Sequence, residues 1–465
     1  MDDSLVIEVP HNPAAHKTAN ISFVLFIAGG VIGIYQMATT VIPFGEGFEM
    51  VALANNLAHS GTFANPFHVL ETGPTAANPP LYPLLLAIII RIFRVPAAIL
   101  FIATLCNVFA NALTASWLPR LSDLIYKDIR PGIVAAVLWL LSVQLMPSWD
   151  TSYTVATLLL FCQVTSSGIQ QQNSARYGAV AGLIAGSLLL FNPSTTLIFL
   201  PWLSWLCFEH RANLKQAARY CGSLLAILLL VGFAWAFRNH QQLGKFLVRT
   251  NLGISLYASN SDCARYSLIL EQLDNCYQAR HPNTSIREAQ LLMSLGEPAY
   301  DRMRVRDTEK WIETHPGPFA SVTLARVRDF WFTPLYSGRL HSAVIWLATL
   351  FSLPGLLLMA FRRVRATLFV FVVLFVYPLM YYVVASDVRY RLPVLWLSLL
   401  PAGYLLTHVT RFMFHPSPKG PSSGHPEPAS ACSSRSGVRE LSEKPLQILA
   451  DDRNQRLRGK FDKGV

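Results

Sequence analysis

Two glutamates follow directly after the first long apolar run of the chain. Glu46 and Glu49 lie in the stretch Pro43–Leu57, and a proline-rich segment, Asn78–Pro83, comes about one loop later. A carboxylate held at a membrane face is costly unless water or a partner compensates its charge, so such a residue is a functional candidate. A carboxylate can also take a proton from a hydroxyl or an amine. We therefore predict acid–base chemistry in this loop.

Other polar segments add carboxylates and arginines that suit a phosphate-bearing substrate. The further carboxylates are Asp150 and Asp387. The candidate substrate-binding residues are Arg238, Arg249, Arg326, Arg389, Tyr390 and Arg391. A guanidinium holds a phosphate through paired, charge-assisted hydrogen bonds. Carboxylates and arginines together indicate a transferase that acts on a phosphate-linked donor.

The composition places these residues in an integral membrane protein. Of the 465 residues, 52% are hydrophobic and only 14% are charged, and the apolar residues fall in long runs. Such runs are typical of membrane-spanning helices. The net charge of +11 gathers in the loops between these runs and in the tail. This distribution indicates positive-inside topology rather than nucleic-acid binding.

We expect an all-α polytopic protein with about ten transmembrane helices, several of them short. The predicted spans are 21–44, 96–118, 132–147, 153–168, 178–191, 195–208, 220–237, 341–361, 366–385 and 392–410. The run Leu81–Ile90 is too short to cross a membrane, follows Pro79 and Pro80, and is closed by Arg91 and Arg94. We therefore predict an interfacial helix there, within a first exterior loop at 45–95.

The interfacial placement of Leu81–Ile90 fixes the side on which every later loop lies. With this run out of the membrane, basic loops such as Arg362–Arg365 share one face with the basic tail, and the positive-inside rule makes that face cytoplasmic. The opposite, exterior face receives the two glutamates, Asp150, the segment 238–340 and Arg389. Both termini are then cytoplasmic.

The chain divides accordingly into five predicted parts. They are a cytoplasmic N-terminus at 1–20, an N-terminal transmembrane catalytic module at 21–237, an exterior lobe at 238–340, C-terminal transmembrane helices at 341–410 and a disordered, basic cytoplasmic tail at 411–465. The tail is rich in Pro, Ser and Gly and cannot bury a core. Cys263 and Cys276 lie in the lobe, where an oxidising compartment allows a disulfide, and the sequence leaves open whether they pair.

Several common catalytic motifs are absent from the sequence. It has no Walker A loop, no dinucleotide-binding glycine pattern, no HExxH and no GxSxG, which argues against nucleotide-driven transport by this chain. The seven cysteines show no CxxC or Cys/His clustering. No histidine accompanies the carboxylates at ligand spacing, so we predict no metal site and no cofactor.

A series of short segments resembles lipid-linked-sugar glycosyltransferases of the GT-C superfamily. The similar segments are Gly47–Ala58, Gly61–Phe63, Thr72–Thr75, Pro79–Ala87, Trp149–Ser152, Asn192–Ser194, Arg238–Asn239, Arg249–Gly253, His281–Pro282, Gly296–Tyr300, His315–Pro316, Arg326 with Phe330–Trp331, and Arg389–Arg391. Their order and spacing extend over most of the chain from about 40 to 400. Within the superfamily they most resemble family 39, the bacterial family related to protein O-mannosyltransferases and aminoarabinose transferases. The resemblance implies a GT-C-like fold and an inner-membrane location.

The resemblance also implies roles for the acidic residues. In that family an acidic residue of the first exterior loop is the proposed catalytic base, and a second acidic residue lies in the next exterior loop. Glu49 or Glu46 corresponds to the first residue and Asp150 to the second. Many members have an adjacent Asp-Glu pair, whereas here Gly and Phe separate the two glutamates. Glu46 fits the usual position counted back from Ala54, and Glu49 fits a subgroup pattern of Gly, aromatic, Glu, Met; we favour Glu49.

Structural roles compete with these assignments. Either glutamate alone can serve only to cap or solvate a loop helix. Asp150 precedes a predicted helix, where it can serve as an N-cap as well as in an active site. The arginines can contact lipid headgroups or snorkel to the membrane interface. Arg389 and Arg391 are the preferred phosphate ligands, because they close a tight exterior turn between two long spans.

The function we predict is transfer of a sugar from a polyprenyl-phosphate-linked donor to a lipid, glycan or protein acceptor on the exterior, periplasmic face. A carboxylate base activates the acceptor and arginines stabilise the departing phosphate, with inversion at the anomeric carbon. The alternatives are a membrane transporter or lipid flippase, and a non-catalytic glycolipid-binding protein of the same fold. Transporters place polar residues near the midplane, whereas here polarity concentrates at one face. That pattern favours the enzyme.

Overall fold

A computed structural model of the chain describes residues 13–45, 47–171 and 173–414, all of which fall within one compact unit that ends at Pro416. Across these residues the secondary structure is helical, with only two isolated β-bridges. Six of the described helices are long and apolar enough to cross a membrane. They are α1 (Pro13–Thr39), α4 (Pro96–Tyr126), α7 (Ser174–Phe191), α9 (Leu214–Leu243), α16 (Arg339–Phe361) and α19 (Leu392–Phe414). The prediction of an all-α membrane protein is confirmed.

Helices that are shorter or less apolar occupy the remaining predicted spans. They are α5 (Arg130–Ser142), α6 (Thr151–Gly168), α8 (Thr196–Glu209), and α17 (Thr367–Val376) with α18 (Leu379–Tyr382). Each predicted run is therefore helical, and the number that crosses the membrane stays a prediction. α19 continues to Phe414, past the predicted start of the tail at 411, and the tail from 415 onward lies outside the described residues.

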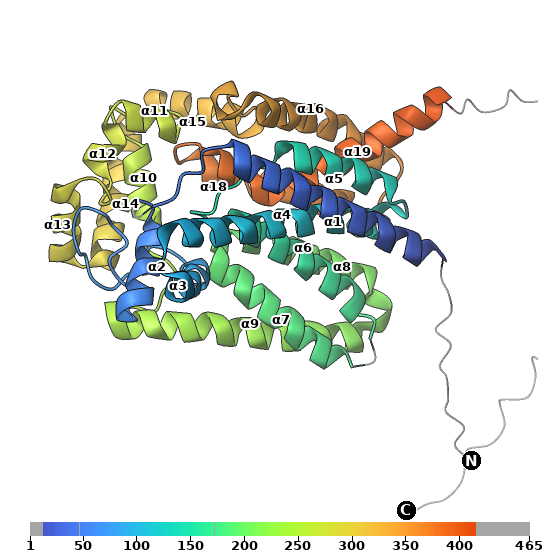
Figure 1. Cartoon of the computed structure of the whole chain (residues 1–465), viewed down its shortest axis with the longest axis horizontal. Coiled ribbons are helices and arrows are strands. Elements are labelled where there is room, and N and C mark those ends of the chain that lie inside the picture. The colour runs from blue at the N-terminus through green and yellow to red at the C-terminus, as the bar shows by residue number, and fades with distance from the viewer. Residues whose placement is uncertain (1–12, 46, 172, 415–465) are drawn as a thin grey trace, which may run out of the picture. The chain divides into compact units, whose positions relative to one another are not determined.

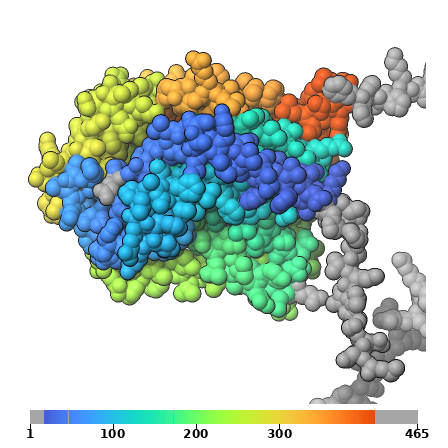
Figure 2. Space-filling view, viewed as in Figure 1, coloured from blue at the N-terminus to red at the C-terminus, as the bar shows by residue number. Residues whose placement is uncertain are grey.

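Between α9 and α16 the chain folds into a cluster of short helices that we call the lobe, residues 244–338. It contains α10 (Leu252–Ser259), α11 (Leu268–Leu273), α12 (Cys276–Arg280), α13 (Ile286–Leu295), α14 (Glu297–Thr314), α15 (Pro316–Trp331) and η3 (Leu335–Ser337). Helices α10 to α14 gather at one end of the long helices (Figure 1). The loop that follows α1 runs alongside the lobe (Figure 2), where Asn283 donates a hydrogen bond of 3.0 Å to the Gly47 carbonyl.

The same loop carries α2 (Glu49–Ser60) and α3 (Leu81–Phe93). One side of α3 is buried, including Tyr82, Leu86 and Ile90, whereas Ile88 and Ile92 on the other side are exposed. An apolar helix of 13 residues with an exposed apolar side suits the membrane interface. The interfacial position of α3 remains a prediction.

Glycines on one face of α7 let α9 pack directly against it. An added Cβ would lie 2.3 Å from the Tyr220 carbonyl oxygen at Gly178 and 2.5 Å from the Leu224 oxygen at Gly182. Such spacing of small residues four apart is typical of close helix packing in membranes. The packing holds the first half of α9 against α7.

Helix α19 is the most deeply buried of the six long helices, because 72% of the residues in its most apolar stretch are buried inside the structure. Trp396, Leu397 and Leu400 belong to the main hydrophobic core. The residues just before this helix form a turn with η4 (Val388–Tyr390). Because the turn leads straight into the core helix, its side chains have little freedom to move.

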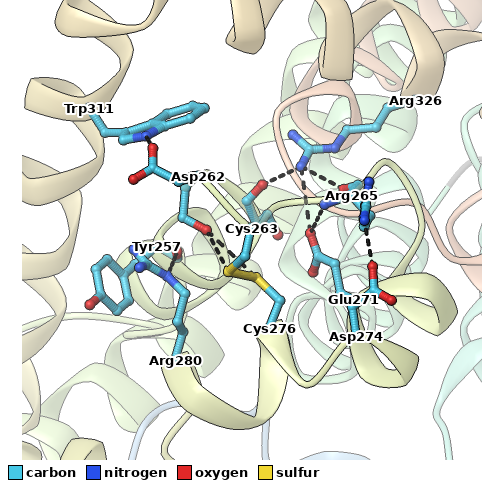
Figure 3. The surroundings of a disulfide bond; sticks show 12 residues. Tyr257, Asp262, Cys263, Arg265, Glu271, Asp274, Cys276, Arg280, Trp311 and Arg326 are labelled. Atoms are coloured by element: carbon cyan, nitrogen blue, oxygen red, sulfur yellow. Dashed lines mark hydrogen bonds and ion pairs between the residues drawn. A yellow bond between two sulfur atoms is a disulfide. The ribbon is translucent and has the colours of Figure 1, made fainter.

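A disulfide joins Cys263 to Cys276 in the lobe, with 5.7 Å between their Cα atoms (Figure 3). The structure thereby answers the question that the sequence left open. The closed loop contains α11, and it pairs with the segment before the turn: the Leu268 amide donates to the Ser386 carbonyl at 3.1 Å, and the Ser386 amide donates to the Tyr266 carbonyl at 2.8 Å. The disulfide loop is therefore tied to the turn that precedes α19.

Candidate active site

A cavity of about 330 Å³ lies where the lobe meets the ends of several long helices; we call it the first cavity. Its wall includes five of the residues predicted from sequence: Glu49, Asp150, Arg249, Arg389 and Tyr390. They come from the start of α2, the residue before α6, the segment before α10, and the turn before α19. The fold thus brings two carboxylates and two guanidiniums from distant parts of the sequence to one space.

Glu49 is the first residue of α2, and two side chains contact its carboxylate. Asn78 donates a hydrogen bond of 3.0 Å to Oε2, and His281 Nε2 lies 3.6 Å from Oε1. The Glu49 side chain is 12% exposed. Glu49 is therefore held in place by one hydrogen bond and lies beside a histidine ring.

His281 is a site residue that sequence reasoning did not select. Its ring stacks on Tyr277, with 4.5 Å between the centroids, and it is almost fully buried. Burial lowers the pKa of His281 below its ordinary value, although Glu49 acts in the opposite direction. The imidazole beside Glu49 is therefore neutral near pH 7. The sequence signal for His281 was the His281–Pro282 segment. This segment lies far from Glu49 along the chain, so the contact between the two residues could not be predicted from the sequence.

Asp150 precedes α6, yet its side chain makes no capping bond to the helix backbone. Its Oδ2 accepts a hydrogen bond of 2.9 Å from the Thr154 hydroxyl instead. Burial raises the pKa of Asp150, while Thr154, Arg389 and Arg249 lower it in turn, and the net shift is upward. The Asp150 residue thus lines the first cavity, where the positive charges of Arg389 and Arg249 act on its carboxylate.

The Arg389 guanidinium lies against an aromatic ring and near a carboxylate. Its Cζ lies 3.4 Å from the centre of the Trp149 ring, a stacking geometry that arginine favours. Nε is 3.5 Å from Asp387 Oδ2, and the Arg389 backbone amide donates to Asp387 Oδ1 at 3.0 Å. Arg249 is anchored differently, since its Nε donates to the Ala77 carbonyl at 2.9 Å.

The three other candidate arginines lie outside the wall of the first cavity. Arg238 donates to the Thr75 and Phe63 carbonyls at 2.7 and 2.8 Å. Arg326 is fully buried and binds Ser259 and Asn260. Arg391 is also buried, and its Nη2 donates to the Thr349 and Ser398 hydroxyls. Their guanidiniums hold loops and helices together in this structure.

Glu46, the alternative candidate for the catalytic base, lies outside the described residues.

Among residues 13–45, 47–171 and 173–414, no three or more His, Cys, Asp or Glu side chains form a group that could hold a metal ion. Glu49 and His281 supply two neighbouring donor groups, fewer than the three protein ligands of a typical catalytic zinc site. The described residues therefore do not fit a metal centre of that kind.

Comparisons with known proteins place the fold. No family model matches the chain, and no curated protein matches its sequence. Two solved structures of the oligosaccharyltransferase of Archaeoglobus fulgidus are similar. Its apo form has a TM-score of 0.52 and 14% identity, covering 85% of this chain and 51% of that one. Its complex with Zn and sulfate has a TM-score of 0.50 and 14% identity, covering 84% and 49%.

This chain therefore spans about half the length of these oligosaccharyltransferases. At 14% identity the likeness is one of fold. Over 84–85% of its length this chain shares the fold of that oligosaccharyltransferase.

Proposed function

We propose that this chain is a membrane glycosyltransferase, related to family 39 of the GT-C superfamily, that takes a sugar from a polyprenyl-phosphate-linked donor. The observation that carries the proposal is the convergence of Glu49, Asp150, Arg249 and Arg389 in the first cavity. Transfer from such a donor needs a group that removes a proton from the acceptor and a group that stabilises the departing phosphate. The first cavity offers both kinds of group.

Glu49 is the general base in this proposal. Asn78 holds one carboxylate oxygen, and the other faces the neutral ring of His281. The acceptor hydroxyl or amine gives its proton to Glu49 as it attacks the anomeric carbon. The bond from that carbon to the phosphate oxygen breaks on the opposite side, which inverts the configuration.

Arg389 and Arg249 receive the departing phosphate. Trp149 and Asp387 fix the Arg389 guanidinium before substrate arrives, and donors fixed in advance stabilise developing charge without reorganisation. Asp150 lies within electrostatic reach of both arginines and attracts their positive charges. Its own role is to position the guanidiniums, and no proton transfer through it is required.

We further propose that the lobe and the first cavity lie on the exterior, periplasmic face of an inner membrane, with both termini cytoplasmic. Arg362 and Arg365 follow α16 at its far end from the lobe, where positive-inside topology expects basic residues. The cavity lies at helix ends rather than halfway along the long helices. This placement supports interfacial catalysis over the transporter alternative. The acceptor is a lipid, a glycan or a protein.

The proposal is tested by a transfer assay with a panel of radiolabelled polyprenyl-phosphate sugars in proteoliposomes. Glu49→Gln keeps the size of the side chain and removes the base, so the transfer rate is expected to fall by about 10²-fold to 10⁴-fold. Glu71→Gln is the matched control, because Glu71 is an exposed glutamate of the same loop. A Glu49→Gln variant that transfers sugar at the wild-type rate would exclude Glu49 as the base.

A further inference from the structure

Two cysteines contact each other across the turn between α8 and α9. The Sγ atoms of Cys207 and Cys221 lie 3.0 Å apart, although the residues are 14 positions apart in the sequence. Cys207 lies in the last turn of α8, and Cys221 lies near the start of α9. Both are free thiols in the structure. The fold therefore brings two reactive groups from different helices into direct contact.

This thiol pair lies at the end of the long helices that is remote from the lobe. Helix α8 starts just after Pro193 and Ser194, which line the first cavity. Helix α9 ends at Leu243, where the chain enters the lobe. The turn between the two helices therefore lies at the opposite end (Figure 1). Under the topology proposed above this end is cytoplasmic, where thiols stay reduced.

Charged neighbours indicate that water reaches the thiol pair. Glu209, two positions after Cys207, pairs with Arg365 at 2.7 Å. Arg219, two positions before Cys221, is exposed. Charged side chains in membrane proteins avoid the hydrocarbon and mark its boundary with water. Since both cysteines are also partly exposed, a water-soluble reagent can reach them.

The turn beside the thiol pair is basic. Arg211, Lys215 and Arg219 are all exposed, and the Arg211 guanidinium lies over the Phe208 ring at 4.4 Å from its centre. The thiolate is the reactive form of cysteine, and neighbouring cations favour it. The turn thus combines a contacting thiol pair, access for water and positive charge.

We propose that Cys207 and Cys221 form a redox site that a low-molecular-weight disulfide, such as oxidised glutathione, converts to an intramolecular disulfide. The thiolate of one cysteine attacks a sulfur of the reagent, and one reagent thiolate leaves. The second cysteine then attacks the mixed disulfide, and the second reagent thiolate leaves. The reagent is reduced to two thiols, which take up the two protons of the cysteines. The site goes beyond the proposed sugar transfer, because it needs neither donor nor acceptor.

The new bond would join two helices that have different packing partners. Trp202 of α8 donates a hydrogen bond of 2.9 Å to the Thr165 hydroxyl of α6, whereas α9 packs on α7 through Gly178 and Gly182. A cross-link between α8 and α9 restricts the unfolded chain. Oxidation is therefore expected to raise the unfolding midpoint in denaturant titrations.

The test treats the full chain in nanodiscs with oxidised glutathione, blocks the remaining thiols by alkylation and maps the peptides by mass without reduction. A cross-linked peptide that joins Cys207 to Cys221 is expected, about 2 Da lighter than the sum of the two reduced peptides. A reductant should remove it. The cross-link should form about tenfold faster than Cys162, which is buried in the core, forms a mixed disulfide.

Single replacements separate a redox pair from two independent thiols. Cys207→Ser removes the second thiol, so a mixed disulfide with glutathione should accumulate at Cys221. Cys221→Ser should give the converse result at Cys207, which provides a second variant should the first fail to fold. Cys106→Ser alters a free cysteine elsewhere and should leave the cross-link unchanged.

Three results would overturn the proposal. They are the absence of the cross-linked peptide after treatment, the absence of a mixed disulfide in both single variants, and an oxidised chain whose unfolding midpoint equals that of the reduced chain. None of these readouts involves sugar transfer. A failure here therefore leaves the proposed function untouched, and a failure of the transfer assay leaves the redox site untouched.

Discussion

The turn at residues 386–391 borders both the first cavity and a second cavity of about 310 Å³, and different chemistry surrounds it on its two sides. In the first cavity Arg389 lies over Trp149 beside Asp150, with Glu49 across the space. In the second, Arg391 is locked into the helix core by hydroxyl groups. Two arginines only two residues apart therefore have different tasks: Arg389 is positioned to meet an anion, whereas Arg391 mainly holds the structure together.

Arg389→Ala is expected to have the largest effect on this comparison. Loss of a fixed guanidinium at a developing negative charge typically costs about 10²-fold to 10³-fold in rate. The transfer assay should show this loss. Arg287→Ala, at an exposed position of α13 in the lobe, serves as the control. Transfer by Arg389→Ala at the rate of this control would exclude Arg389 as the group that stabilises the departing phosphate.

Loss of the disulfide is the next largest expected effect, and it should reach both cavities. Cys263 and Cys276 are 13 positions apart, and closing a loop of this size contributes about 3 kcal/mol to the free energy of unfolding. Replacing both by serine should lower the unfolding midpoint in denaturant titrations. It should also lower the transfer rate, because Leu268 of the loop lines the first cavity. Cys106→Ser, which alters a free cysteine, is the control. If this control lowers the unfolding midpoint as much as loss of the disulfide does, the disulfide loop has no special role in stability.

The pH dependence of stability should distinguish the first cavity through His281. Burial holds the pKa of His281 below its ordinary value of 6.5. Just below that pH, the unfolded chain therefore binds a proton at His281 that the folded chain does not bind. Stability contributed by this group is complete above about pH 6.5 and is lost as the pH falls below it, by at most about 1.4 kcal/mol per pH unit. Thermal unfolding from pH 7.5 to 5 should therefore decline more steeply for the wild type than for His281→Gln. Parallel curves would contradict the buried, neutral state of His281.

The sequence predicted the helices well, because long apolar runs leave few other structures in a membrane. It also selected Glu49, Asp150, Arg249 and Arg389, which line the first cavity and whose roles there stay predictions. Polarity beside an apolar run does not show which backbone carbonyl an arginine will bind. The same signal selected Arg238 and Arg326, which donate to the Thr75 and Ser259 carbonyls in the fold.

Long-range contacts account for most of what the sequence could not predict. His281 reaches Glu49 only through the packing of α12 and its flanking loop against the loop that carries α2. The Cys263–Cys276 pair depends on a Cα separation that spacing does not fix. The second cavity is built from four separate segments, and no local pattern marks such an assembly.

The most direct test of the central claim is an experimental structure of the chain with a bound polyprenyl phosphate. The proposed function predicts that the phosphate lies in the first cavity, within hydrogen-bond distance of Arg389 and Arg249 and on the side that faces Glu49. A phosphate bound in the second cavity, or away from both arginines, would contradict the assignment of the active site.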